Sequence, residues 1–235
     1  MFGGTGFVGS YIVKELLSDG IHVLATCRNI QKSQWVKDLG GVDKQSILSL
    51  HEFEYGRDGK PNDDTSTKVL TEDLLPGTDA IFFCIGYEKQ EPETVTYMVN
   101  ACLTILDAAK QEMEKSNKKV GYWKYTALYI SLLFVGGYCR ISNGLYFYIQ
   151  ITVVVTSSTG STNPPDAQSD ALKNELDFWS DPELQKKNGR FSPAAKTLME
   201  VSALEFVGRN KRNEIIDNEL ASKTPRYCLL ILICS

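Results

Sequence analysis

Three glycines near the start of the chain have the spacing of a turn that binds phosphate groups. Gly3, Gly6 and Gly9 lie in the run GGTGFVGS. In such a motif the first glycine permits a tight turn, the second lets the backbone approach a pyrophosphate, and the third lets the following helix pack closely on a sheet. The positive N-terminal end of that helix then faces the phosphates. The residues that we expect to bind a dinucleotide cofactor are Gly3, Thr5, Gly6, Phe7, Val8 and Gly9.

The end of the following apolar run, 21–27, indicates which dinucleotide is bound. A site that prefers NAD places Asp or Glu there, about twenty residues after the glycines, to hold the ribose hydroxyls. Here the chain continues Cys27-Arg28-Asn29 without a carboxylate. An arginine can pair with the 2′-phosphate of NADP through a charge-assisted fork. The sequence therefore predicts NADP with Arg28 as its partner; alternatively, Arg28 is one more solvated surface arginine.

Two further segments carry polar groups that can act on a substrate. The apolar run 153–155 ends in Thr156-Ser157-Ser158, and doubly wound folds bind their ligands at the carboxyl edge of the sheet. A serine hydroxyl there can donate to a substrate oxygen as charge develops on it, although serines also commonly begin loops. Lys196 stands among apolar residues in the run 191–200, where it is either functional or a surface lysine whose stem covers apolar neighbours.

The elements that must hold these residues alternate along the chain. Apolar residues at helical spacing predict helices near 8–17, 93–114 and 193–207, with a shorter helix at 33–39. Apolar runs predict strands at 21–27, 47–53, 80–85 and 151–156, whereas the polar run 57–67 predicts a loop. This alternation predicts an α/β fold, a Rossmann-type doubly wound parallel sheet with helices on both faces.

Composition sets further limits. The 235 residues are 43% hydrophobic and carry a net charge of −4, which allows one domain with a proper core. This charge gives no electrostatic attraction to nucleic acid or to an anionic membrane. The six cysteines form no C-x-x-C pair, so we expect no metal site, no disulfide framework and a cytoplasmic location. The expected partner is a small-molecule substrate.

Five motifs occur in a recognisable order: GGTGFVGS, CRN, VVVTSSTGS, NELDFWSD and AAKTLMEVSA. Together they resemble the extended short-chain dehydrogenase/reductases, the NAD-dependent epimerase/dehydratase superfamily, and in particular its dihydroflavonol reductase, cinnamoyl-CoA reductase and 3β-hydroxysteroid dehydrogenase members. The resemblance implies NADP-dependent carbonyl reduction or alcohol oxidation by a serine, a tyrosine and a lysine. By motif position, Ser158 would be the catalytic serine and Lys196 the catalytic lysine, supported by Asn100.

One position departs from the family pattern. The family's tyrosine stands four residues before the lysine, where this chain has Ser192. A serine hydroxyl is a far weaker acid than a phenol and protonates an alkoxide poorly. Ser192 is therefore a candidate catalytic residue in place of the tyrosine, unless the chain has lost this acid. Within the same resemblance we expect Gly86, which closes the predicted strand 80–85, and Lys196 to contact the cofactor.

Three segments fit this pattern less well. Only Met1 and Phe2 stand where the glycine motif needs a preceding strand, so we expect a truncated first strand and, because its neighbours lack partners, an insoluble or molten chain. Residues 120–150 form an atypical hydrophobic insert, as an unspliced intron would produce. Residues 223–235 form an aberrant hydrophobic tail where the family begins its substrate domain, which is largely missing. The expected Rossmann domain covers 1–119 and 151–222.

Three functions remain open at this point. The first is an NADP-dependent oxidoreductase that acts on CH–OH groups or carbonyls of a small organic substrate. The second is a catalytically silent NADP-binding regulatory protein that lacks the active-site tyrosine. The third is a membrane-associated protein anchored through 125–149, although its longest uncharged run, 125–139, is shorter than the roughly 20 residues that span a bilayer.

Overall fold

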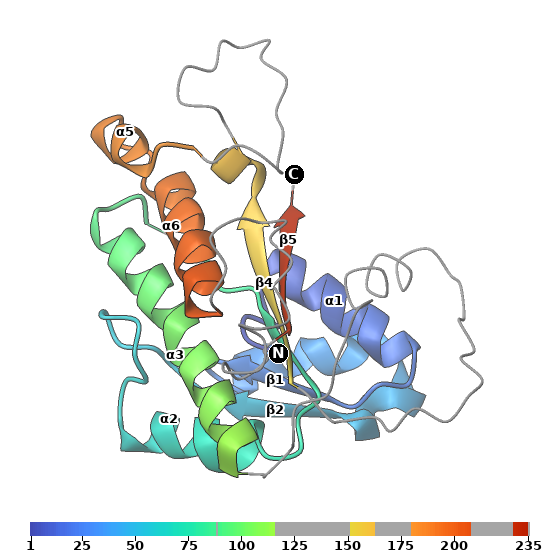
Figure 1. The fold of residues 1–235 in the computed structure, drawn as a ribbon. Helices are drawn as coiled ribbons and strands as arrows, with labels where there is room; N and C mark the ends of the chain where they lie inside the picture. The colour runs from blue at the N-terminus through green and yellow to red at the C-terminus, as the bar shows by residue number, and fades with distance from the viewer. Residues whose placement is uncertain (88, 116–150, 163–179, 208–227, 235) are drawn as a thin grey trace, which may run out of the picture.

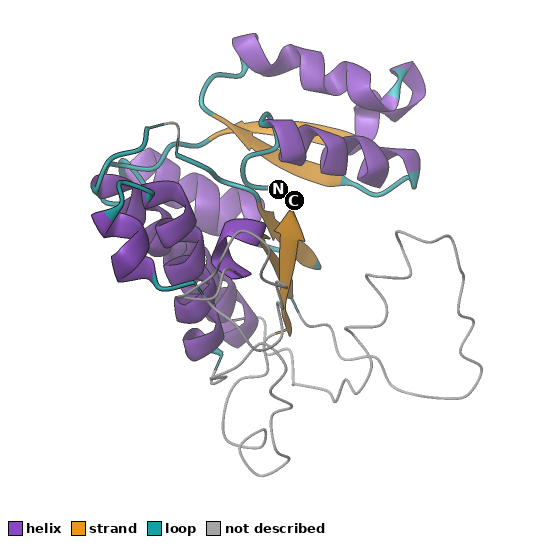
Figure 2. Cartoon of the chain, turned by 90° about the horizontal axis from the view of Figure 1, so that it is seen from above, coloured by secondary structure: helices purple, strands orange, loops and turns teal. Residues whose placement is uncertain are grey.

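The computed structural model describes residues 1–87, 89–115, 151–162, 180–207 and 228–234 (Figure 1). The α/β architecture expected from the sequence is confirmed. Each pairing between the strands is parallel, and helices lie on both sides of the strands when the molecule is seen from above (Figure 2).

The strands form two parallel sheets. β1 (Val23–Cys27) pairs with β2 (Leu48–Glu52) in one sheet. In the other, β4 (Thr152–Ser158) lies between β3 (Ala80–Phe83) and β5 (Cys228–Cys234). These strands agree with the sequence prediction for 21–27, 47–53, 80–85 and 151–156, with ends that differ by a few residues.

Met1 and Phe2 join the two sheets. The amide of Phe2 donates to the carbonyl of Phe82 (2.8 Å), and the amide of Cys84 donates to the carbonyl of Phe2 (2.9 Å). On the other side, the amide of Thr26 donates to the carbonyl of Met1 (2.9 Å). The resulting order is β2, β1, the Met1–Phe2 segment, β3, β4 and β5, which is the order of a Rossmann sheet with two residues in the place of its first strand.

The apolar run near the C-terminus differs from the sequence expectation. The sequence predicts a tail outside the Rossmann domain over 223–235. In the structure, β5 pairs with β4 in parallel register, from Thr152 opposite Cys228 to Ser158 opposite Cys234. A continuous apolar run is typical of a strand in a parallel sheet, and its pairing with β4 places this segment in the sheet.

The helices largely follow the predicted periodicity, with one correction. The predicted loop 57–67 contains the start of α2 (Asp64–Lys68), because the carboxylate of Asp63 accepts from the amide of Ser66 (2.7 Å) and caps the helix. The remaining helical elements are α1 (Phe7–Ser18), α3 (Glu93–Lys115), α5 (Pro182–Lys187), α6 (Phe191–Phe206), the 3₁₀ helices Gln31–Gly40, Val42–Ile47 and Thr159–Thr162, and the π-helix Val69–Leu74.

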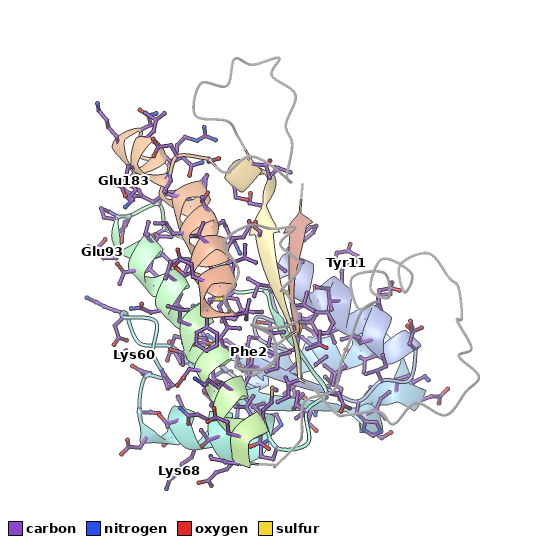
Figure 3. The ribbon with its side chains drawn as sticks, viewed as in Figure 1. Phe2, Tyr11, Lys60, Lys68, Glu93 and Glu183 are labelled. Atoms are coloured by element: carbon purple, nitrogen blue, oxygen red, sulfur yellow. The ribbon has the colours of Figure 1, made fainter. Side chains whose placement is uncertain are left out.

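Two apolar cores hold the helices to the strands. The larger core joins α3 and α6 to β3 and β4, and the smaller core joins α1 to β1. In Figure 1, α3 and α6 lie side by side on one side of β4 and β5. Phe2 belongs to the larger core with only 2% of its surface exposed, and Figure 3 shows it in the interior, whereas Lys60, Lys68 and Glu183 lie at the periphery. The central position of Phe2 couples the glycine turn that follows it to this core.

The predicted hydrophobic insert, 120–150, and with it the predicted anchor at 125–149, lie outside the described residues. Within the part of the chain that the structure describes, no helix combines the length and the apolarity that crossing a membrane requires.

Candidate cofactor and active site

The glycine turn passes directly from the Met1–Phe2 segment into α1. The amide of Gly6 donates to the carbonyl of Gly3 (3.0 Å) and closes the turn. Gly3 has a φ of +77°, and a Cβ atom on Gly9 would lie 2.0 Å from the Gly3 carbonyl oxygen. Both positions therefore require glycine. Since no described side chain caps α1 at Gly6, the backbone N–H groups of its first turn are suited to an anion.

A cavity of about 830 Å³ lies against this turn. Its wall also includes the last residues of β4 and residues that follow the carboxyl ends of β1, β2 and β3, the edge at which doubly wound folds bind ligands. The cavity brings together nearly all the site residues predicted from the sequence: Gly3, Thr5, Gly6, Phe7, Val8, Arg28, Gly86, Ser158, Ser192 and Lys196. Gly9 is not part of the wall and instead packs against the turn itself.

Lys196 reaches the ends of two strands from α6. Its ammonium group donates to the carbonyl of Thr156 on β4 (2.8 Å) and to the carbonyl of Ile85 just after β3 (3.3 Å). Burial raises the pKa of the Cys102 thiol to about 12, and the positive charge of Lys196 opposes this rise. The two carbonyl contacts fix a positive charge at the carboxyl edge of the sheet.

The two adjacent serines at the end of β4 have different environments. Ser157 is only 4% exposed, and its hydroxyl donates to Oε2 of Glu200 (2.8 Å). Both serines line the cavity, but Ser158 is half-buried, and its hydroxyl oxygen accepts from the amide of Gly160 (3.1 Å). Of the two hydroxyls, that of Ser158 is the better placed to meet a substrate.

Ser192 lies in the first turn of α6. It precedes Lys196 by four residues, so both side chains project from the same face of the helix. The backbone amide of Ser192 donates to Oε1 of Gln90 (3.0 Å), which ties the start of α6 to the loop after β3. Ser192 therefore stands at the residue position where the family pattern has a tyrosine, with an aliphatic hydroxyl in place of a phenol.

Arg28 directly follows β1 and lines the cavity together with Arg57 and Tyr97. Burial raises the pKa of the Tyr97 phenol, and the neighbouring guanidinium of Arg28 partly offsets that rise. Arg57 follows β2, the strand next to β1. Two guanidinium groups after neighbouring strands provide donors that match a phosphate group.

Asn100 differs from its predicted role as a support of Lys196. From α3, its side-chain amide donates to the carbonyl of Asp58 (2.8 Å). One turn later, the hydroxyl of Thr104 contacts the carbonyl of Gly59 (3.5 Å). Asn100 thus holds the turn that follows β2, and it is not among the residues that line the cavity.

Several residues of the site were not identified from the sequence. Tyr55, Arg57, Tyr87 and Tyr97 line the cavity, and the Tyr55 hydroxyl is buried with no partner among the described residues. Burial raises the pKa of Tyr55 well above its ordinary value. Tyr55 and Tyr87 follow the ends of β2 and β3, so their position after a predicted strand was the signal that could have found them.

Comparison with known proteins gives similar chains of about twice this length. No family model matches the chain. A dihydroflavonol 4-reductase of Hordeum vulgare is 26% identical over 219 residues, which cover 88% of this chain and 48% of that protein. Since the chain spans about half the length of this relative, the match leaves the other half of the relative without a counterpart here.

Solved structures have the same fold. Vestitone reductase from alfalfa (Medicago sativa L.) superposes with a TM-score of 0.54 at 22% identity, covering 89% of this chain and 52% of its own. Gre2 from Candida albicans, solved in complex with NADPH, superposes with a TM-score of 0.59 at 18% identity, covering 98% of this chain and 55% of its own. Both have the Rossmann-type fold that the sequence predicts for this chain.

Proposed function

We propose that this chain, a member of the extended short-chain dehydrogenase/reductases (the NAD-dependent epimerase/dehydratase superfamily), is an NADP-dependent oxidoreductase that reduces a carbonyl group or oxidises an alcohol on a small organic substrate. One observation carries this proposal. A single cavity contains the glycine turn with the N-terminus of α1 and, in the same wall, Ser158 and Lys196. Such a cavity can hold a dinucleotide beside the groups that would act on a substrate oxygen.

The residues present fit NADP. Because Gly9 packs tightly against Gly3, the turn is compact and its glycines present no side chain to the space beside it. The first turn of α1 has no cap from a described side chain, so its N–H groups can donate to a pyrophosphate. Arg28, with Arg57 after the adjacent strand, would hold the 2′-phosphate. When bound, the cofactor would supply or accept a hydride. We further propose that Thr5, Phe7, Val8 and Gly86 contact it along the same wall.

The chain's own residues would then handle the substrate oxygen. The hydroxyl of Ser158 would donate to this oxygen, and the ammonium of Lys196, held by two backbone carbonyls, would stabilise the negative charge that develops on it. Ser192 would have to supply the proton. Because an aliphatic hydroxyl is a poor acid, we expect reduction to be slow in this chain.

The hydroxyl at position 192 also supports a second candidate function. A chain with the glycine turn and Arg28 but without the phenol would still bind NADP, and would act as a catalytically silent NADP-binding regulatory protein. The two functions share the cofactor and differ in turnover.

Titration of NADPH and NADH against the intrinsic fluorescence of the protein, followed by NADPH oxidation with a panel of aldehydes and ketones, separates the two functions. Binding of NADPH with turnover supports the oxidoreductase. Binding without turnover, also in a Ser192→Tyr variant, supports the silent protein. If NADPH does not bind to folded protein, both are wrong.

A further inference from the structure

Glu200 on α6 is a completely buried acidic residue next to the candidate site. Its side chain is 0% exposed, although glutamates are almost never fully buried unless they are paired. Both the hydroxyl of Ser157 (2.8 Å) and that of Ser161 (3.1 Å) donate to the same carboxyl oxygen, Oε2. Glu200 therefore connects α6 to the end of β4 and to the turn that follows it.

The hydroxyls that Glu200 binds also shape the turn around Ser158. The Ser161 hydroxyl lies 2.7 Å from the carbonyl of Ser158 and 3.1 Å from the hydroxyl of Ser157. Each serine carries one hydroxyl hydrogen, so Ser157 donates to Glu200 while Ser161 shares its hydrogen between Glu200 and the Ser158 carbonyl. The residue before Ser158 and the hydroxyl that contacts the Ser158 carbonyl are thus both bound to the same carboxyl oxygen of Glu200, which restrains the backbone of Ser158.

Glu200 and Lys196 hold the same strand at neighbouring points. They are four residues apart on α6 and lie one helical turn from each other. Lys196 donates to the carbonyl of Thr156 (2.8 Å), and Glu200 accepts from the hydroxyl of Ser157. These two contacts prevent the end of β4 from sliding along α6. They therefore also fix the position of Ser158 relative to the Lys196 ammonium.

We propose that Glu200 is a positioning residue, which acts through Ser157 and Ser161 to hold the hydroxyl of Ser158 toward the cavity and in register with Lys196. The proposal rests on the proposed oxidoreductase function, because it assigns Ser158 a role at the substrate oxygen. Glu200 does not line the cavity, so its loss should disturb the chemical step and leave cofactor binding intact.

Three substitutions on α6 test the proposal. Glu200→Met keeps the length of the side chain and removes both oxygens. Glu200→Gln keeps one amide oxygen, which can still accept from both hydroxyls because both use a single oxygen. Glu205→Gln is the matched control, since Glu205 is exposed on the same helix. A fourth variant, Ser157→Ala, removes the donor without changing α6 and serves where Glu200→Met does not fold.

The measurements are kcat, KM, the Kd for NADPH and the amide hydrogen exchange of the segment 156–162. For Glu200→Met we expect kcat to fall about 10²-fold, as for a misplacement of about 1 Å, with an unchanged Kd for NADPH and faster exchange in 156–162. Glu200→Gln should restore most of kcat, and Glu205→Gln should match the unsubstituted protein. An unchanged kcat, or a parallel loss of NADPH binding, would overturn the proposal.

Amide exchange also separates a failure of this proposal from a failure of the proposed function. If the unsubstituted protein binds NADPH but converts no substrate, the oxidoreductase function fails by itself. In that case, faster exchange in 156–162 for Glu200→Met and Ser157→Ala, but not for Glu205→Gln, still supports the positioning role of Glu200. Equal exchange in all four proteins contradicts it.

Discussion

The buried α-ammonium group of Met1 makes the stability of a polypeptide that starts at this residue depend on pH. The group donates to the carbonyl of Leu24 (2.6 Å), in the place where a longer first strand would continue. Burial lowers its pKa from the ordinary value of 8.0 to about 5, and the neighbouring Cys84 side chain only partly opposes this change. Folding must therefore bury a charge or release a proton.

The size of the effect follows from the two pKa values. The unfolded chain binds the proton below pH 8 and the folded chain binds it only below about pH 5, so stability falls as the pH decreases from 8 to 5. One pKa unit is about 1.4 kcal/mol, so the full loss is about 4 kcal/mol. At pH 7 the loss is about 1 kcal/mol, a noticeable part of the roughly 5–15 kcal/mol by which domains are stable.

An N-terminal extension converts this ammonium into an uncharged amide that can still donate to Leu24. We expect a flexible Gly-Ser extension of five residues to raise the free energy of unfolding by about 1 kcal/mol at pH 7 and to leave it unchanged at pH 9. An extension of five β-branched residues should add the pairing of a longer first strand to this gain and increase the soluble fraction of the protein.

Urea unfolding of the three proteins at pH 6, 7 and 9 measures these differences. The reasoning is wrong if the 235-residue chain loses no more stability than the Gly-Ser extension between pH 9 and pH 6. A β-branched extension that is no more stable than the Gly-Ser extension would show that Met1 and Phe2 already satisfy the central position of the sheet.

Three further predictions concern the cavity. Arg28→Ala should weaken the binding of NADPH about 10–100-fold and leave that of NADH unchanged, because a hydrogen bond to a charged group contributes about 1.5–3 kcal/mol. Fluorescence titration measures the Kd of both cofactors, and Lys32→Ala, at an exposed position, is the control. Ser192→Tyr should raise kcat about 10²–10⁴-fold by restoring a general acid, and an unchanged rate of NADPH oxidation would mean that the proton comes from elsewhere. Gly9→Ala should lower the free energy of unfolding by at least about 1–3 kcal/mol and abolish NADPH binding, whereas Gly86→Ala, whose Cβ meets nothing within 4 Å, should unfold like the unsubstituted protein.

The local features of this molecule were predictable from the sequence. The tight turn requires residues without a Cβ atom at positions 3 and 9, and the glycine spacing predicted this turn. The alternating apolar runs and helical periods predict the order of most strands and helices. Because the carboxyl ends of parallel strands share one edge, residues placed after different strands, such as Arg28 and Ser158, were expected near one another. The cavity brings them into one wall.

The contacts between distant segments were decided by the tertiary structure. Asn100 has the type and position of a support for Lys196, yet its amide bonds to Asp58, because the turn after β2 packs on that part of α3. Likewise, an apolar C-terminal run has no local property that distinguishes a tail from a strand, and its pairing with β4 makes it β5.

The sequence by itself determined most of the elements, the glycine turn and the serine in place of a phenol at position 192, since each depends on residue type and local spacing. Only the tertiary structure decided which of two identical neighbours has its hydroxyl bound by another side chain, although both line the cavity. Ser157 and Ser158 have the same side chain, but the buried carboxyl of Glu200, 43 residues further along the chain, binds the hydroxyl of Ser157. That choice depends on how α6 packs against β4, and no local pattern of residues encodes such a contact.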